Sequence, residues 1–301
     1  MRKHIVAIIL CFTVGGLFCN LLFAAEYTVA VRAHQGIDGA IKKWQPTIDV
    51  LNREIPQHTF ILLPIISIVE IEQRAGRGEV QFILTNPSSF VDIEKLYGAH
   101  ALLTLNNKRA NTAQSRFGSV IFTHVRNTDI LTLKDLQDKT LMAVSELAFG
   151  GWRVAWLEML EQGFNPYQGL KTLMFTQGET QPEVVRAVRD GIAHAGVVRT
   201  DRLERMESAG EIDMRYFRIL NNKDVKGFPF FLSTELYPEW AFAVLKSVPS
   251  ELSQQIKNVL LSITVESTAA QKGRYVGWIS PLDYLPVKEL MRQLQVGSYA
   301  D

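Results

Sequence analysis

One short segment of the sequence has the composition of an anion-binding turn. Residues 143–153, AVSELAFGGWR, pass from an apolar strand pattern through Gly150 and Gly151 into an amphipathic helical pattern. A helix N-terminus exposes unpaired backbone N–H groups at the positive end of the helix dipole, and both favour a bound anion. Glycines at this entrance would let a ligand approach the backbone. The alternative is that they only permit the turn and tight packing of the helix.

Arg199 is the first candidate for the charge that would hold such an anion. It directly follows the apolar run AHAGVV, and parallel α/β sheets present ligand groups at the C-terminal ends of their strands. A planar guanidinium matches sulfonate, phosphate or carboxylate oxygens. The alternatives are an arginine in solvent or one paired with Asp201. Thr200 is expected to cap the following helix, which would keep it near the same cleft.

Polar residues also follow two earlier strand patterns. His34 and Gln35 come after YTVAVRA, and Asn86 comes after VQFILT. In a parallel sheet these positions open toward one edge, where they would donate hydrogen bonds to an oxyanion. A histidine in contact with an anion would make binding pH-dependent near neutrality. The alternatives are a structural role for His34 and a helix-capping role for Asn86.

The candidate site also includes residues on both sides of the two glycines. Phe149 lies at the helix entrance, where its ring would form a wall of the cleft, whereas Trp152 and Trp156 share one helical face and are core residues by default. The complete set of candidate ligand-binding residues is His34, Gln35, Asn86, Ser145, Phe149, Gly150, Gly151, Trp152, Arg199 and Thr200.

Other kinds of chemistry have little support in this sequence. There is no G-x-S-x-G motif, no H-E-x-x-H motif among the six histidines, and no G-x-G-x-x-G or Walker loop. Both cysteines, Cys11 and Cys19, lie near the N-terminus, so the rest of the chain has no thiol. With 32 basic and 31 acidic side chains, no nucleic-acid-binding character is visible. We expect no enzymatic activity, no metal, no cofactor and no nucleic-acid partner.

Strand and helix patterns alternate along the chain and predict two α/β lobes. A chain of 301 residues exceeds the usual single hydrophobic core. We expect residues 26–123 to form the first part of lobe 1 and residues 124–222 to form lobe 2. Residues 223–301 should return to lobe 1 and end in C-terminal helices. Each lobe would be a mixed sheet flanked by helices, and two extended strands would form the hinge.

The N-terminus predicts export. Arg2, Lys3 and His4 precede an uncharged apolar run from Ile5 to Ala25, which is typical of a signal peptide; an uncleaved membrane anchor is the alternative. We therefore expect residues 1–25 to direct the chain to the periplasm. Exported pairs of α/β lobes with a double hinge are typical of periplasmic solute-binding proteins, which hold their ligand in the cleft.

Several long stretches carry a family resemblance. VRAHQGIDGAIKKWQPTIDVL, FILTNPSSFVDIEKLYG, GSVIFTHVRNTDILTLKDLQDKTLMAVSELAFGGW, HAGVVRTDRLERM and LYPEWAFAVLKSVPSEL together resemble the phosphate/phosphonate-binding, type 2 periplasmic-binding family. The segments FGGWRVAWLEMLEQG, VRTD and GWISPLDYLPVKELMRQLQVGSY are similar to the branch that forms periplasmic sensory domains of tetrathionate-type sensor histidine kinases.

This resemblance implies a receptor for a small oxyanion of phosphonate, phosphate or sulfur-oxyanion type. The partner would be an inner-membrane ABC permease or a sensor histidine kinase. In the phosphonate-binding family the matching turn carries Ser and Thr hydroxyls that hold the phosphonate oxygens. Here Ala148, Phe149 and Gly150 occupy that stretch, with Ser145 nearer the strand. The sequence therefore predicts loss of the hydroxyl clamp and a ligand other than a standard phosphonate.

Overall fold

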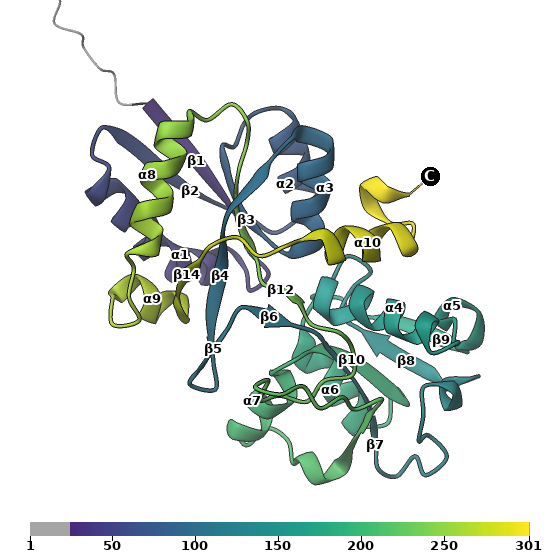
Figure 1. The fold of residues 1–301 in the computed structure, drawn as a ribbon. Helices are drawn as coiled ribbons and strands as arrows, with labels where there is room; N and C mark the ends of the chain where they lie inside the picture. The colour runs from purple at the N-terminus through teal and green to yellow at the C-terminus, as the bar shows by residue number, and fades with distance from the viewer. Residues whose placement is uncertain (1–24, 301) are drawn as a thin grey trace, which may run out of the picture.

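The first of two lobes is built on a seven-stranded mixed sheet (Figure 1). The computed structural model describes residues 25–300, so the predicted signal or anchor segment lies almost entirely outside it. In sheet order the strands are β14 (Tyr275–Ile279), β4 (His100–Arg109), β13 (Ala241–Val244), β3 (Phe82–Thr85), β1 (Ala25–Arg32) and β2 (His58–Ile65), with β5 (Thr112–Gln114) beside β4. β1 is parallel to β2 and β3, whereas β13 is antiparallel to β3 and β4. β1, β3 and β4 therefore end at the same edge of the sheet.

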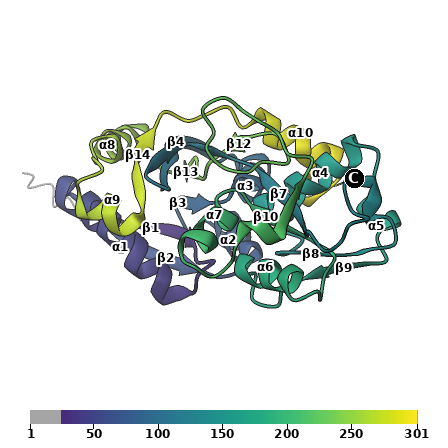
Figure 2. The ribbon, with the colours of Figure 1, turned by 90° about the horizontal axis from the view of Figure 1, so that it is seen from below.

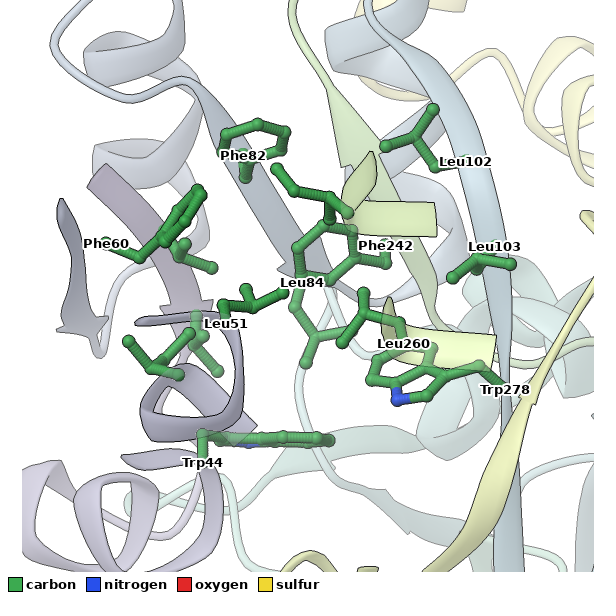
Figure 3. Close-up of a cluster of buried hydrophobic side chains, with 14 of the residues drawn as sticks. Trp44, Leu51, Phe60, Phe82, Leu84, Leu102, Leu103, Phe242, Leu260 and Trp278 are labelled. Carbon is green, nitrogen blue, oxygen red and sulfur yellow. The ribbon is translucent and has the colours of Figure 1, made fainter. Parts of the chain in front are cut away.

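Alternating side chains of this sheet form two cores. Val29 and Val31 face one side, where α1 (Ile37–Glu54), α8 (Ser250–Leu261) and α9 (Thr268–Gly273) pack. Ala30 faces the other side, toward α2 (Ile68–Gly76) and α3 (Pro87–Tyr97). This period of two is what strand geometry imposes on a sheet covered on both faces. Figure 3 shows the first core, in which Trp44 of α1 and Trp278 of β14 enclose Leu51, Leu84 and other buried side chains.

The second lobe has a five-stranded sheet in the order β11 (Phe217–Leu220), β7 (Ser119–His124), β10 (Ala195–Arg199), β8 (Thr140–Ala143) and β9 (Thr172–Phe175). β8, β9 and β10 are parallel, and β7 is antiparallel to both of its neighbours. The helices are α4 (Val154–Glu161), α5 (Pro166–Gly169), α6 (Gln181–Arg189) and α7 (Arg202–Ser208); α4 follows a π-helical turn, η2 (Phe149–Arg153). Short 3₁₀ turns are η1 (Lys134–Leu136), η3 (Met214–Tyr216) and η4 (Gly297–Tyr299).

Two short antiparallel strands connect the lobes. They are β6 (Arg116–Phe117) and β12 (Tyr237–Pro238), with Phe117 opposite Tyr237. β7 already belongs to the second sheet, and Ser233 donates its backbone N–H to Ser119 of that strand. The hinge therefore differs from the predicted lobe boundaries after residues 123 and 222. The reason is that a strand pattern in the sequence does not reveal which sheet the strand joins.

The C-terminal helix α10 (Leu285–Gln293) belongs to neither sheet but lies beside α4 of the second lobe and α3 of the first (Figure 2). Leu290 and Met291 share a buried cluster with Phe90 of α3 and with Val154 and Leu157 of α4. α10 thereby connects the two lobes on the side of the helix entrance. Within residues 25–300, no helix combines the length and apolar character that crossing a membrane requires.

Candidate functional site

A cavity of about 810 Å³ lies between the lobes and is strongly basic. Its cationic side chains are Arg32, Lys42, Lys43, Arg109, Arg199, Arg202, Arg205, Lys272 and Arg274, whereas its acidic side chains are Asp49, Glu179 and Asp201. The whole chain has a net charge of only +1. Concentration of one sign of charge in a cleft focuses the field there and attracts ligands of opposite sign.

Seven of the ten candidate residues line this cavity, namely His34, Gln35, Asn86, Phe149, Gly150, Gly151 and Arg199. Ser145, Trp152 and Thr200 are not part of its lining. Trp152 is completely buried, and its indole N–H donates to the Tyr167 hydroxyl at 3.3 Å. The Thr200 hydroxyl accepts the N–H of Gly118 at 3.3 Å, whereas Asp201 is the N-cap residue of α7. The expectation that Thr200 caps this helix is therefore wrong.

The two glycines at the helix entrance are required by packing. A Cβ atom at Gly150 would lie 2.6 Å from the Phe117 ring and 3.3 Å from the Cγ atom of Arg199. A Cβ atom at Gly151 would lie 2.6 Å from the side chain of Val144. Both separations of 2.6 Å are shorter than van der Waals contact. Of the two interpretations of this turn, the structure thus supports tight packing, since protein side chains occupy the space that the glycines leave.

The entrance turn also contacts the hinge. Phe149 is buried, and its ring packs edge-on against Phe117 and Tyr237 at centroid distances of 5.9 and 5.3 Å. Those two residues face each other in the β6–β12 pair. Phe149 therefore forms a wall of the cavity and at the same time connects the helix entrance to the hinge.

Arg199 is held by an acidic residue at the hinge. Its guanidinium forms an ion pair with Glu239, directly after β12, and lies 3.9 Å over the Phe117 ring. Glu239 is completely buried and also accepts a hydrogen bond from the Asn107 amide. Burial opposes the charged form of both partners, but their attraction outweighs it, so the pKa of Arg199 is raised and that of Glu239 is lowered.

Asp201, the partner of Arg199 in one of the alternatives, pairs with other arginines instead. Its carboxylate lies 3.5 Å from Arg109 of the first lobe and 3.6 Å from Arg205 of α7. The Arg109–Asp201 pair therefore joins the two lobes across the cavity. Burial and repulsion by the like charge of Arg199 together lower the pKa of Arg109 to about 10.

Four arginines of the cavity each have a buried N–H group without a hydrogen-bond partner among the described residues. The atoms are Nη1 of Arg32 and the Nε atoms of Arg109, Arg199 and Arg202. Leaving a buried donor unpaired costs about 1–3 kcal/mol, and more for a charged group. Because arginine can only donate, acceptor oxygens of an anionic ligand are the chemistry that would satisfy these groups.

His34 is neutral in this environment. Its ring opens into the cavity and packs edge-on against Trp240 at 5.4 Å. Desolvation of the ring by the protein atoms around it and the charges of Lys43, Arg32 and other cations lower the pKa of His34 to about 3. The expectation that His34 titrates near neutral pH is therefore wrong. It still has one ring N–H to donate.

The group of this cavity with a pKa near neutrality is Lys43 rather than His34. Burial and the charge of Arg109 lower its pKa to about 7, and its ammonium lies 4.6 Å from the centroid of the Trp44 ring. An anion bound beside this ammonium would raise the pKa again.

Asn86 has the capping role proposed as an alternative. Its side-chain oxygen accepts the N–H of Ser89 at 3.0 Å and the hydroxyl of Ser88 at 2.8 Å, and Pro87 occupies the first turn of α3. Asn86 nevertheless lines the cavity.

Sequence reasoning missed four important residues, namely Arg32, Lys43, Arg109 and Glu239. Arg32 ends β1 as Arg199 ends β10, so the same argument about strand ends would have found it. Arg109 lies in the polar segment NNKRA, which extends β4 into a hairpin with β5. Glu239 stands alone among apolar residues in LYPEWAFAV, which is a signal for a buried and paired carboxylate.

Comparison with known proteins supports a binding function. Residues 33–284 match the family model described as "ABC transporter, phosphonate, periplasmic substrate-binding protein". A curated relative, the tetrathionate sensor histidine kinase TtrS of Salmonella typhimurium, is 28% identical over 281 residues, which are 93% of this chain and 45% of that protein. The chain thus spans less than half the length of this relative.

Solved structures share the fold. A Xanthomonas citri protein bound to ATP superposes with a TM-score of 0.69 at 17% identity, covering 91% of this chain and 97% of that one. PhnD1 from Prochlorococcus marinus, in complex with methylphosphonate, has a TM-score of 0.69 at 13% identity, covering 89% of this chain and 98% of that one. These likenesses confirm the predicted two-lobed α/β fold of type 2 periplasmic-binding proteins. The family and its structural neighbours are binding proteins rather than enzymes. Because the family model covers most of its length, the chain belongs to the phosphonate-type periplasmic substrate-binding proteins of ABC transporters.

Proposed function

We propose that this chain captures a small oxyanion in the cleft between its lobes, in the periplasm, and that closure of the lobes is its output. The observation that carries the proposal is the set of four buried and unpaired arginine N–H groups in a basic cavity. The Arg109–Asp201 and Arg32–Glu179 pairs, which connect the lobes, would respond to an anion bound among them.

Among oxyanions, the donor chemistry favours a sulfur oxyanion over a phosphonate. Phosphate-type groups titrate with a pKa of about 6, so part of the population carries an O–H that needs an acceptor. Glu179, Asp201 and Glu239 are already paired with arginines, and Asp49 accepts a hydrogen bond from the Gln45 amide. Sulfonate-type ends carry no proton at neutral pH and only accept hydrogen bonds. The entrance turn has no hydroxyl clamp, and Ser145 does not line the cavity.

The relative named as a tetrathionate sensor matches 93% of this chain. Tetrathionate is therefore the first candidate ligand, and a histidine kinase is a candidate partner beside the permease that the family implies. A sensing role predicts that ligand changes the autophosphorylation of a kinase that contains or contacts this domain. An uptake role predicts ligand-dependent stimulation of a permease ATPase.

The direct test is a thermal-shift screen of the purified chain with tetrathionate, thiosulfate, sulfate, phosphate and methylphosphonate, followed by calorimetric titration. A ligand present at about 100 times its Kd stabilises a protein by about 2.7 kcal/mol, which is easily seen. We expect tetrathionate to bind the parent protein and an Arg53→Gln control, in which an exposed arginine outside the cavity is changed. Arg109→Gln should weaken binding strongly. If none of the five anions stabilises the chain, the proposal fails.

A further inference from the structure

Two arginines of the cavity, Arg32 and Arg109, come from strands of the first lobe that are not neighbours. Arg32 is the last residue of β1 and Arg109 the last of β4, and strands β3 and β13 lie between them in the sheet. Neighbouring strands are about 4.8 Å apart, so the axes of β1 and β4 are separated by about 14 Å. In the other lobe, Arg199 is the last residue of β10 and Glu179 lies in the turn after β9, with β8 between these two strands in the sheet. Across the cavity, Arg32 of the first lobe therefore meets Glu179 of the second, and Arg109 of the first lobe meets Asp201 of the second.

Arg32 and Arg199 have different acidic partners. Glu179 is the charge that acts on Arg32, whereas Arg199, Asp201 and Glu239 act on Arg109. Only 5% of the Arg32 side chain is exposed, although it lines the cavity. Its Nη1 atom is buried and has no hydrogen-bond partner among the described residues. The end of β1 thus carries a buried guanidinium with one N–H group available to a ligand.

Glu179 is held much less firmly than the arginine it contacts. It reaches across from the turn between β9 and α6, and 41% of its side chain is exposed. Its backbone has a positive φ of 52°, a conformation that non-glycine residues adopt only at a cost. The buried Arg32 guanidinium needs an anionic partner, whereas the half-exposed Glu179 carboxylate can return to water. The Glu179 carboxylate therefore pairs with the Arg32 guanidinium in the position that a terminal oxyanion of a ligand would take, and such a ligand can displace it.

We propose that Arg32 is a second anion subsite, and that the ligand of this cleft is an elongated dianion with one charged group at each end. One end binds near the helix entrance with Arg199 and Arg109; the other binds Arg32 and displaces Glu179. This inference rests on the proposed oxyanion-binding function. The cavity of about 810 Å³ supports it, because pockets of roughly 300–1,000 Å³ hold ligands much larger than a single oxyanion.

The test compares two ligands that differ only in the second charge. Ethane-1,2-disulfonate has a sulfonate at each end, and ethanesulfonate has one; tetrathionate and thiosulfate form a second pair of long and compact anions. Titration calorimetry gives the ratio of their affinities for the parent protein, Arg32→Gln, Arg32→Lys, Glu179→Gln and the Arg53→Gln control. Circular dichroism and the unfolding midpoint show whether each variant is folded.

We expect the parent and the control to bind ethane-1,2-disulfonate at least tenfold more tightly than ethanesulfonate. Arg32→Gln should reduce this ratio to below about threefold, with little change for ethanesulfonate, and Arg32→Lys should retain part of it. Glu179→Gln should bind the disulfonate more tightly, since no carboxylate has to be displaced. The same order is expected for tetrathionate against thiosulfate.

Two results would overturn the second subsite while leaving the proposed function intact. In the first, single-ended anions bind the parent as tightly as double-ended ones. In the second, a folded Arg32→Gln variant keeps the parent ratio. Weaker disulfonate binding by Glu179→Gln would refute the displacement of this carboxylate. Failure of every anion to bind the parent would instead refute oxyanion binding itself.

Discussion

Replacement of Glu239 by Gln is the most informative single change at the hinge. The carboxylate is completely buried, pairs with Arg199 and accepts a hydrogen bond from Asn107. Removing one partner of a buried ion pair leaves the other charge uncompensated and typically costs 3–5 kcal/mol. Because Arg199 borders the cavity and keeps some access to water, we expect the lower value, about 3 kcal/mol. For a chain of this size the unfolding midpoint should fall by roughly 5 °C.

Two matched variants make the assay specific. Glu235→Gln changes a carboxylate that is 73% exposed and paired with Lys223, and the loss of stability there should stay below about 1 kcal/mol. Arg199→Gln removes the other partner of the buried pair. Sulfate should restore more stability to Glu239→Gln than to Arg199→Gln, because only the first variant keeps a guanidinium for the anion.

The pH dependence gives an independent check. Since the pKa of Glu239 is lower in the folded than in the unfolded protein, its stabilising effect is present at neutral pH and is lost as the pH falls through the folded pKa. The difference in calorimetric unfolding midpoint between the parent and Glu239→Gln should therefore stay constant from pH 7 down to the ordinary glutamate pKa of 4.5 and shrink only below it. A loss of stability at pH 7 no larger than that of Glu235→Gln would refute the reasoning.

Three further predictions concern the helix entrance and the cavity wall. Gly150→Ala places a Cβ atom 2.6 Å from the Phe117 ring and should lower the free energy of unfolding in urea by about 1–3 kcal/mol; a variant as stable as the parent would contradict the packing role of this glycine. Lys43 has a pKa of about 7 beside Arg109, Arg199, Arg274 and Glu239, so a bound anion should raise this pKa, and anion affinity should be higher at pH 6 than at pH 8. Lys43→Met should abolish the difference in titration calorimetry, and an unchanged pH profile would exclude Lys43 as its source. Asn86→Ala removes the cap of α3 and should cost about 1 kcal/mol in thermal unfolding, a loss that a purely ligand-binding role would not produce.

Local features of the fold were predictable because their causes are local. Hydrophobic periodicity located β1, β3 and β10 and placed His34, Asn86 and Arg199 just after or at their ends. The sequence Asn-Pro indicated a cap of α3 as one of two roles for Asn86, since the capping oxygen and the N–H group that donates to it are only a few residues apart. The glycine-bearing helix entrance was likewise found at the predicted place.

The purpose of those glycines was not predictable. Whether a ligand or a side chain occupies the space above Gly150 depends on Phe117, which reaches the turn from the hinge. The same limit applied to β7, whose pattern predicted a strand but not the sheet that it joins. Residues of the polar segment around Arg109 became a hairpin because β14 and β5 provide hydrogen-bonding partners from elsewhere in the chain.

By itself the sequence determined the alternation of strands and helices, the two-lobed α/β fold and the polar groups at the strand ends, because periodicity and capping act over a few residues. Only the tertiary structure decided how the charges are paired. Arg32 meets Glu179 147 residues away, and Arg199 meets Glu239 40 residues away rather than its neighbour Asp201. Such pairs follow from the order of strands in two sheets and from the position of the hinge, which bring distant residues together in a cavity where water is scarce and each charge must find a partner.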